Sequence, residues 1–243
     1  MFRGRLLIDH WPAAIYAIGD IHGCLDEFVA LEARIVADSV GIAGEKWLLT
    51  LGDHIDRGPD SAGVIERLLS PPPPGFRRLA LRGNHEQVML DFLADPLPND
   101  GWLFEGGAET LASYGVALDD IESGLTAAEL LRRIRARVPD RHLRFMEALP
   151  FLVSLPGWVF VHAGLRPGVA LDRQVDQDLI WIREPFLSAP KFPGVRVVHG
   201  HTPGPRPVVT PARFGIDTHC FHTGRLTALR VTPAGEPVLL SVG

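Results

Sequence analysis

The chain has only two cysteines, Cys24 and Cys220, among its 243 residues. A secreted domain held by disulfides needs more cysteines, so that class of protein is excluded, and a reducing compartment, the cytoplasm, is the expected location.

Long hydrophobic runs are also scarce. The longest uncharged stretch, 148–165, has the length of a membrane span, but Pro150 and Pro156 interrupt it. We therefore expect a loop, a strand and a loop there, and no membrane association.

The sequence also lacks an excess of basic residues. It has 24 lysines and arginines against 29 aspartates and glutamates, which gives a formal net charge of −5. Domains that bind nucleic acid generally carry a basic excess, so we expect no nucleic-acid partner. The content of 46% hydrophobic and 22% charged residues excludes a disordered chain, a collagen repeat and a coiled coil. Its 25 glycines and 21 prolines indicate many connections between short elements, which is typical of a loop-rich α/β protein.

A short apolar run that leads into residues able to bind metal or phosphate, with a glycine close by, recurs five times. Each run has the length of a buried strand. The runs lie at 15–18, 47–51, 79–81, 159–161 and 195–198. Helical patterns follow the first three, at 25–37, 61–69 and 87–93. This alternation predicts an α/β fold with a largely parallel or mixed sheet, whose ligands collect beyond the carboxyl ends of the strands. Two later strand-like runs, 226–231 and 238–242, are expected to complete a second sheet.

Residues 95–150 carry no such polar cluster. Helical patterns at 126–138 and 140–149 predict a helical insert packed beside the sheet, within a single domain that spans 1–243. Six arginines fall in the stretch 131–144. Charge runs of this kind are usually a solvated helix face, and the alternative is a basic wall that attracts an acidic substrate or partner.

Six of the side chains near the strand ends have the chemistry of metal ligands. They are Asp20, His22, Asp53, Asn84, His162 and His201. Carboxylate, amide and imidazole donors without a thiolate suit divalent ions such as Mn²⁺, Fe²⁺ or Zn²⁺. Two such ions about 3.5–4 Å apart would leave the site net positive and lower the pKa of bound water toward ~7. They would also bind the attacking oxygen and the leaving oxygen of an in-line displacement at phosphorus. The sequence therefore predicts phosphoester hydrolysis without a covalent intermediate.

Three motifs, in their order along the chain, resemble those of a known family. Gly-Asp-Ile-His-Gly at 19–23, Gly-Asp-His-Ile-Asp-Arg-Gly at 52–58 and Gly-Asn-His-Glu at 83–86 are similar to the signature of the phosphoprotein-phosphatase (serine/threonine protein phosphatase) branch of the metallophosphoesterases. The resemblance continues with His162-Ala163-Gly164 and Gly200-His201-Thr202 and covers most of the chain. It implies the four-layer α/β/β/α sandwich of that superfamily.

The resemblance also implies a role for each side chain. The implied ligands are Asp20, His22 and Asp53 for one metal and Asp53, Asn84, His162 and His201 for the other. Mn²⁺ is the expected ion, and a hydroxide held by both metals would attack phosphorus directly. His85 would protonate the leaving alkoxide, and Asp56 would orient His85. Arg57 would bind phosphate oxygens, as would Arg183 in a Trp-Ile-Arg-Glu segment that resembles bacterial and phage members.

Three further side chains keep alternatives open. His54 stands where relatives commonly have an aromatic residue, and His219 stands where glycine is common. Either imidazole could line the cleft, as a support for the site or as a substrate contact. Trp102 is either a packing anchor or a contact for a nucleobase.

The leading hypothesis is metal-dependent hydrolysis of phosphomonoesters, on phosphoserine or phosphothreonine in proteins or on a phosphorylated small molecule. A symmetrical dinucleoside-tetraphosphate (Ap4A) hydrolase has nearly the same core motifs and is the alternative, and it would need to recognise a nucleobase. A non-catalytic phosphate-binding or scaffold protein predicts a missing ligand or a missing acid, and neither is missing.

Overall fold

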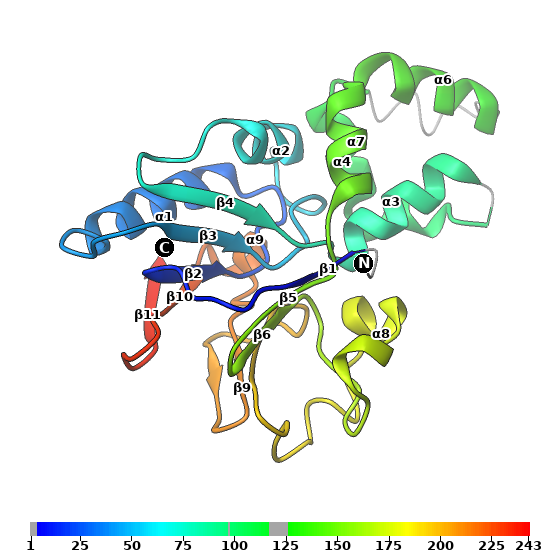
Figure 1. Ribbon diagram of the computed structural model, residues 1–243. Coiled ribbons are helices and arrows are strands. Elements are labelled where there is room, and N and C mark those ends of the chain that lie inside the picture. The colour runs from blue at the N-terminus through cyan, green and yellow to red at the C-terminus, as the bar shows by residue number, and fades with distance from the viewer. Residues whose placement is uncertain (1–3, 97, 117–125) are drawn as a thin grey trace.

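The structure is a computed structural model that describes residues 4–96, 98–116 and 126–243. Two mixed sheets pack face to face, and helices cover their outer faces (Figure 1). The predicted four-layer α/β/β/α sandwich is confirmed. Among the described residues, no helix is both long and apolar enough to cross a membrane.

The first sheet carries the three N-terminal strand motifs. In spatial order its strands are β11 (Val238–Val242), β10 (Leu226–Val231), β2 (Ala14–Ile18), β3 (Lys46–Thr50) and β4 (Phe76–Ala80). β2, β3 and β4 run parallel, so their carboxyl ends lie at one edge. The prediction that 226–231 and 238–242 complete a second sheet is wrong. Both join this sheet, where Ala228 of β10 lies opposite Ile18 of β2. β10 is apolar on both faces and therefore suits an interior position in the sheet.

The second sheet consists of strands that the sequence pattern showed only in part. Its order is β1 (Arg5–Leu7), β5 (Leu152–Leu155), β6 (Trp158–Val161), β7 (Arg196–His199), β9 (Arg213–Gly215) and β8 (Val208–Val209). The stretch 148–165 is a hairpin of β5 and β6, not the single strand predicted. Its two-residue turn is Pro156-Gly157, and Gly157 has a φ of 82°, which suits glycine. β6 and β7 are parallel, so the segments that follow them leave at the same edge.

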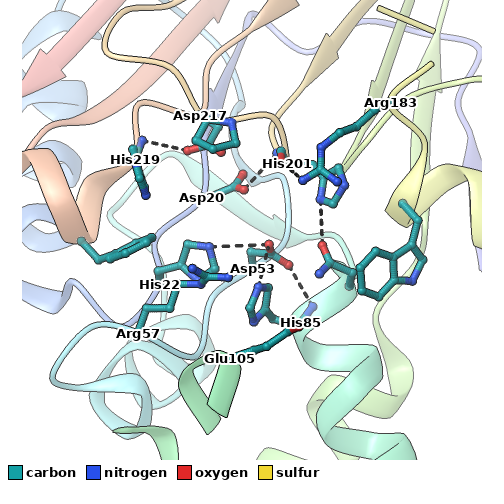
Figure 2. Close-up of a pocket in the computed structure, with 14 residues that line it drawn as sticks. Asp20, His22, Asp53, Arg57, His85, Glu105, Arg183, His201, Asp217 and His219 are labelled. Carbon is teal, nitrogen blue, oxygen red and sulfur yellow. Dashed lines mark hydrogen bonds and ion pairs between the residues drawn. The ribbon is translucent and has the colours of Figure 1, made fainter. Parts of the chain in front are cut away.

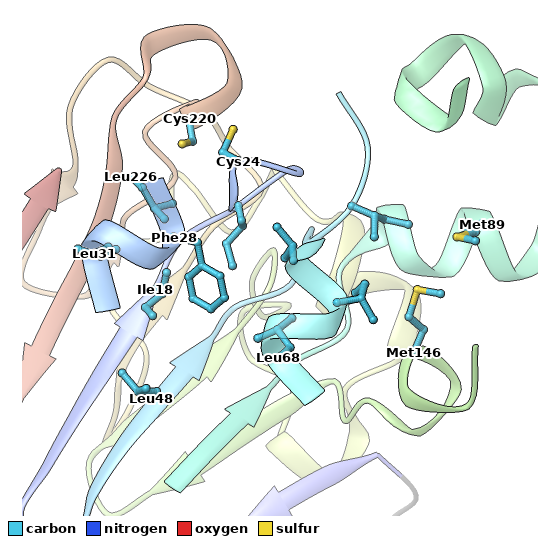
Figure 3. Packing of buried hydrophobic residues seen from close by; sticks show 14 of the residues in the cluster. Ile18, Cys24, Phe28, Leu31, Leu48, Leu68, Met89, Met146, Cys220 and Leu226 are labelled. Atoms are coloured by element: carbon cyan, nitrogen blue, oxygen red, sulfur yellow. The ribbon is translucent and has the colours of Figure 1, made fainter. Parts of the chain in front are cut away.

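Three apolar cores hold the layers together. Between the sheets, Leu49 of β3 packs in one cluster with Phe160 of β6. The first sheet packs on its outer face against α1 (Leu25–Asp38), α2 (Ser61–Leu69) and α3 (Asn84–Ala94). Figure 3 shows Ile18 and Leu48 beside Phe28 on that face. The second sheet packs on its outer face against η2 (Leu171–Arg173), α8 (Asp176–Trp181) and the loops around them.

The helical insert packs beside the helices of the first sheet. Its described elements are η1 (Leu103–Gly107), α4 (Ala108–Ser113), α6 (Ala127–Arg137) and α7 (Asp140–Ala148). Residues 97 and 117–125 of the predicted insert lie outside the described residues. Leu111, Ile134 and Met146 belong to the core cluster that includes α2 and α3 side chains. Five of the six arginines in 131–144 are exposed, as a solvated helix face requires, and none is among the residues that line the cleft described below.

Candidate metal centre and acid–base site

The strand ends converge on one polar cleft of about 270 Å³ between the carboxyl edges of the two sheets. Five of the six predicted metal ligands line it, namely Asp20, His22, Asp53, Asn84 and His201 (Figure 2). The sixth, His162, is fully buried directly behind Asp53 and Asn84. Parallel strands within each sheet bring these loops to a common edge, although the side chains are far apart in the sequence.

The backbone is strained at this site. Six non-glycine residues in the described parts of the chain have φ in the left-handed region, and all six belong to this site or its loops. They are His22 (46°), Asp53 (48°), Asp56 (73°), Arg57 (70°), His201 (60°) and His219 (60°). Such conformations cost on the order of 1–3 kcal/mol each and cluster where function requires them.

One group of donors surrounds Asn84. Its Oδ1 atom lies 2.9 Å from His162 Nε2 and 2.9 Å from His201 Nδ1. Asp53 Oδ1 lies 3.3 Å from His162 Nε2. The donor atoms of Asp53, His162 and His201 all lie within 4.8 Å of one another. This group has the composition of the second predicted metal position.

The other donors lie around Asp20 and His22. His22 Nδ1 lies 2.9 Å from the Ile55 carbonyl oxygen, which directs Nε2 toward Asp53 Oδ2 at 3.6 Å. Asp20 Oδ2 accepts a hydrogen bond of 2.9 Å from the His201 amide. Asp53 therefore stands between the two donor groups, as a shared ligand requires.

Two buried atoms test whether these residues fit metal ions. Asp20 Oδ1 and His201 Nε2 have no hydrogen-bond partner among the described residues. An unpaired buried polar atom costs about 1–3 kcal/mol, so such atoms usually have a partner. A carboxylate oxygen and an imidazole nitrogen beside further oxygen and nitrogen donors suit a divalent cation. The residues present therefore fit the two predicted ions.

Burial and neighbouring charges set the ionisation of the site. Burial lowers the pKa of His22 to about 4 and that of His201 to about 3, so both imidazoles are neutral at pH 7, as metal ligation requires. Burial and the charge of Asp217 raise the pKa of Asp20 well above its usual value. Although burial opposes it, the neighbouring His162 holds the pKa of Asp53 well below its usual value.

His85 and Asp56 form a buried hydrogen-bonded pair. His85 Nδ1 lies 2.6 Å from Asp56 Oδ2, and His85 Nε2 lies 3.9 Å from Asp53 Oδ2 at the cleft. Burial opposes protonation of the imidazole, but the Asp53 and Asp56 carboxylates raise the pKa of His85 to about 9. His85 is thus protonated at neutral pH and can donate a proton. Asp56 also accepts hydrogen bonds from Trp102 and Thr110, which the sequence did not indicate.

Both predicted phosphate-binding arginines line the cleft. Figure 2 shows Arg57 and Arg183 on opposite sides of the ligand cluster. Arg57 Cζ lies 5.2 Å from the centroid of the Phe221 ring, and Arg183 Nη2 lies 3.5 Å from the His201 carbonyl oxygen. Neither arginine has a carboxylate partner among the ion pairs of the described residues, so both guanidinium groups are available to an anion.

His54 does not line the cleft, so the alternative in which its imidazole contacts the substrate is wrong. It is fully buried, with Nε2 at 2.7 Å from Thr50 Oγ1 and Nδ1 at 3.3 Å from Glu86 Oε1. The Glu86 carboxylate accepts hydrogen bonds from the amides of Gly83, Asp53 and His54. Against the effect of burial, the charge of His54 lowers the pKa of Glu86 to about 2. These two side chains hold the loop that carries Asp53.

His219 does line the cleft, beside Asp217 and Phe221. Its ring makes an edge contact with the Phe221 ring, with the two centroids 4.5 Å apart. Trp102 is only 2% exposed, so the nucleobase contact suggested for it is wrong. Its indole packs on Phe92 and donates to Asp56.

Five of the six ligands, the His85 imidazole and the two arginines that the family resemblance implies line the cleft, and His162 lies buried behind it. Residues 13–228 match the family model described as calcineurin-like phosphoesterase. The chain belongs to the calcineurin-like phosphoesterase family. Family members are phosphoesterases that use divalent metals, and the fold and the donor set of this chain agree with that.

Relatives within the family carry different names. The chain is 36% identical over 228 residues to serine/threonine-protein phosphatase 1 of Salmonella typhimurium, with 89% of this chain and 91% of that protein covered. It is 31% identical over 237 residues to the asymmetrical bis(5′-nucleosyl)-tetraphosphatase PrpE of Geobacillus thermodenitrificans, with 88% of each covered. The chain also superposes on a crystal structure described as a diadenosine tetraphosphatase, with a TM-score of 0.68 and 22% sequence identity. The superposition covers 99% of this chain and 98% of that chain, and it shows that the two share a fold.

Proposed function

We propose that this member of the family is a metal-dependent phosphomonoesterase whose substrates are phosphoserine and phosphothreonine residues of proteins. The observation that carries the proposal is the position of His85. Its Nδ1 atom is bound to Asp56, and its Nε2 atom stands at the cleft beside the metal donors and near Arg57. An acid is needed at that place when the leaving group is a serine or threonine alkoxide.

The metal ligands are the six residues that the sequence indicated. We assign Asp20, His22 and Asp53 to one divalent ion and Asp53, Asn84, His162 and His201 to the other. Mn²⁺ is our first choice for both ions, and Fe²⁺ or Zn²⁺ fits the same donors. When bound, the pair supplies Lewis acidity at phosphorus and lowers the pKa of a coordinated water.

The protein's own side chains bind the phosphate group and protonate the leaving oxygen. Arg57 and Arg183 hold the phosphate oxygens from two sides, and guanidinium geometry suits that task. A water-derived oxygen forms the new bond to phosphorus as the bond between phosphorus and the leaving oxygen breaks, and the electron pair of the broken bond goes to the leaving oxygen. His85 Nε2 donates a proton to this oxygen, and Asp56 keeps the other imidazole N–H in place.

Three observations support a protein substrate. The cleft is lined mainly by charged and polar side chains, the buried Trp102 offers no stacking surface, and the relative at 36% identity is named a serine/threonine-protein phosphatase. The proposal includes a cytoplasmic location, which agrees with two free buried cysteines.

A dinucleoside tetraphosphatase is the second candidate, because PrpE relatives align with most of the chain. Trp181 and Phe221, both partly exposed at the cleft, are the aromatic side chains that a nucleobase would meet.

Purified protein with Mn²⁺ should be assayed on a phosphothreonine peptide and on Ap4A at equal concentration. The proposal predicts a higher kcat/KM on the peptide. Exclusive cleavage of Ap4A would overturn it, and the products would then show the position of the cut, with two ADP from symmetrical cleavage and ATP plus AMP from asymmetrical cleavage. Arg183→Ala should raise KM for the preferred substrate, and the exposed Arg132→Ala is its control.

A further inference from the structure

The Asp56 carboxylate is held by three side chains from separate parts of the chain. Asp56 has no exposed surface. Its Oδ2 atom accepts from His85 Nδ1 at 2.6 Å and from Trp102 Nε1 at 2.8 Å, and its Oδ1 atom accepts from Thr110 Oγ1 at 2.6 Å. His85 lies in the first turn of α3, whereas Trp102 and Thr110 belong to the helical insert. The insert is therefore in direct contact with the proposed acid–base pair.

Thr110 binds Asp56 at two points. Its hydroxyl donates to the carboxylate and accepts a hydrogen bond of 2.9 Å from the Asp56 amide. Ser61 Oγ also accepts from that amide at 3.0 Å. Asp56 has a φ of 73°, which a residue with a side chain seldom adopts. One threonine hydroxyl thus holds both the side chain and the strained backbone of Asp56.

Two adjacent glycines let the insert approach this closely. A Cβ atom on Gly107 would lie 2.5 Å from ring carbons of Trp102, and one on Gly106 would lie 2.6 Å from the Arg57 amide nitrogen. The Gly106 carbonyl oxygen accepts a hydrogen bond of 3.3 Å from that amide. Gly106 has a φ of 115°, which suits glycine, and marks a kink within η1. The 102–110 segment is shaped to fit the loop that carries Asp56 and Arg57.

These contacts matter because they stabilise the ionised form of the Asp56 carboxyl group. Burial raises the pKa of the Asp56 carboxyl, and the hydrogen bonds from His85, Thr110 and Trp102 each act against that rise. An ionised carboxylate fixed in this place keeps a proton on His85 Nδ1 and directs Nε2 at the cleft.

We propose that Trp102 and Thr110 are positioning residues that hold Asp56 against His85, and that the enzyme needs them to protonate a poor leaving group. This inference rests on the proposed function, because it takes His85 as the acid. Neither side chain is among those that line the cleft. The insert is thereby part of the catalytic machinery, in addition to its packing role.

The test compares leaving groups that differ in their need for an acid. Thr110→Val removes the hydroxyl donor with little change in shape, and Trp102→Phe removes the indole N–H donor together with part of the ring. On a phosphothreonine peptide, kcat should fall by about tenfold to a hundredfold, the factor that corresponds to a lost hydrogen bond to a charged group. On p-nitrophenyl phosphate, whose leaving group needs little protonation, kcat should fall by less than about threefold. Manganese content and KM should not change.

Matched variants separate positioning from folding. Thr110→Ser keeps the hydroxyl and should restore most of the rate on the peptide, whereas Glu109→Gln, an exposed change on the same helix, should match the unaltered protein. His85→Ala gives the reference pattern of selective loss. Equal losses on both substrates, or no rescue by serine, would overturn the inference.

A second measurement does not depend on the substrate. The low-field proton resonance of the His85 Nδ1–H should be present in the unaltered protein, absent in His85→Ala and shifted in Thr110→Val. An unshifted resonance would overturn the inference even if the enzyme is active. If the unaltered protein does not turn over the phosphopeptide, the proposed function fails, and the resonance by itself then decides whether Trp102 and Thr110 position His85.

Discussion

His85 Nδ1 lies 2.6 Å from Asp56 Oδ2, across a sequence separation of 29 residues. Asp56 lies in the loop after β3, and His85 lies at the start of α3 after β4. Because β3 and β4 are parallel neighbours, their loops leave the sheet side by side and the two side chains can meet. Arg57 follows Asp56 directly. The same loop therefore orients the proposed acid and carries a guanidinium group for phosphate.

The alanine variant of His85 should retain its metal and lose turnover. The imidazole is bound to Asp56 through Nδ1 and lies outside the six assigned ligands. We expect kcat on a phosphothreonine peptide to fall by about 10²–10⁴, the usual contribution of a general acid. Steady-state kinetics and metal analysis of the same sample check this. Loss of metal would make His85 a ligand, which its distance of 3.9 Å from Asp53 would permit.

Asp53→Asn should remove metal and activity together. Asp53 Oδ1 lies 3.3 Å from His162 Nε2 and Oδ2 lies 3.6 Å from His22 Nε2, so its two oxygens serve both donor groups. An amide has one neutral oxygen acceptor and bridges two cations poorly. Metal content after dialysis should fall well below two ions per chain, and Asp9→Asn, an exposed change, should keep both. Two tightly held ions in Asp53→Asn would refute the shared-ligand assignment.

Phe221→Leu should weaken substrate binding through Arg57. The Arg57 guanidinium packs on the Phe221 ring, and contacts of this kind contribute about 0.5–2 kcal/mol. We expect KM to rise about twofold to tenfold with little change in kcat. Phe221→Tyr keeps the aromatic face and should keep the KM of the unaltered protein. The same KM in Leu and Tyr variants would mean that the ring does not position Arg57.

Each of the buried histidines His22 and His199 should make the metal-free protein less stable at pH 5 than at pH 7, whereas the raised pKa of Asp20 acts in the opposite direction. Burial lowers the pKa of His22 and His199 to about 4, whereas an unfolded histidine titrates near 6.5. Between these values the unfolded state binds more protons, so stability falls as the pH decreases. The loss is on the order of 2 kcal/mol for each histidine at pH 5. Urea unfolding of the unaltered protein and of His199→Gln, in the presence of EDTA at both pH values, checks the contribution of His199, and the same pH dependence in both proteins would contradict it.

Arg78→Ala should destabilise the fold without touching the cleft. The Glu32 carboxylate, only 1% exposed, accepts hydrogen bonds of 2.6 Å from both Arg78 and Arg67. Removal of the buried Arg78 would leave Glu32 with a single, partly exposed partner. We expect the free energy of unfolding to decrease by about 3 kcal/mol. Arg132→Ala, at an exposed position, should change it by less than about 0.5 kcal/mol. Equal midpoints for the two variants would show that the buried pair contributes nothing.

Local patterns predicted the elements that build the first sheet. The helix predicted at 61–69 is α2 with the same bounds, and the strands predicted at 226–231 and 238–242 are β10 and β11. The sequence-based prediction failed where the result depended on which strands pair with each other. The pattern of β10 marks a strand buried on both faces, but it does not say which sheet contains it. Likewise, two short strands around Pro156-Gly157 look like one interrupted run until the β5–β6 hairpin pairs them.

The sequence by itself determined the chemistry of the site. The identity and order of Asp20, His22, Asp53, Asn84, His162 and His201, each just beyond an apolar run, specify oxygen and nitrogen donors at strand ends. Only the tertiary structure decided which other side chains support them. Trp102 and Thr110 reach Asp56 from a helical insert 46 and 54 residues away, and His54, for which a place in the cleft was one alternative, is fully buried and supports the loop of Asp53. A strand-end motif is local and can be recognised from its neighbours, whereas a hydrogen bond between distant elements depends on how those elements pack.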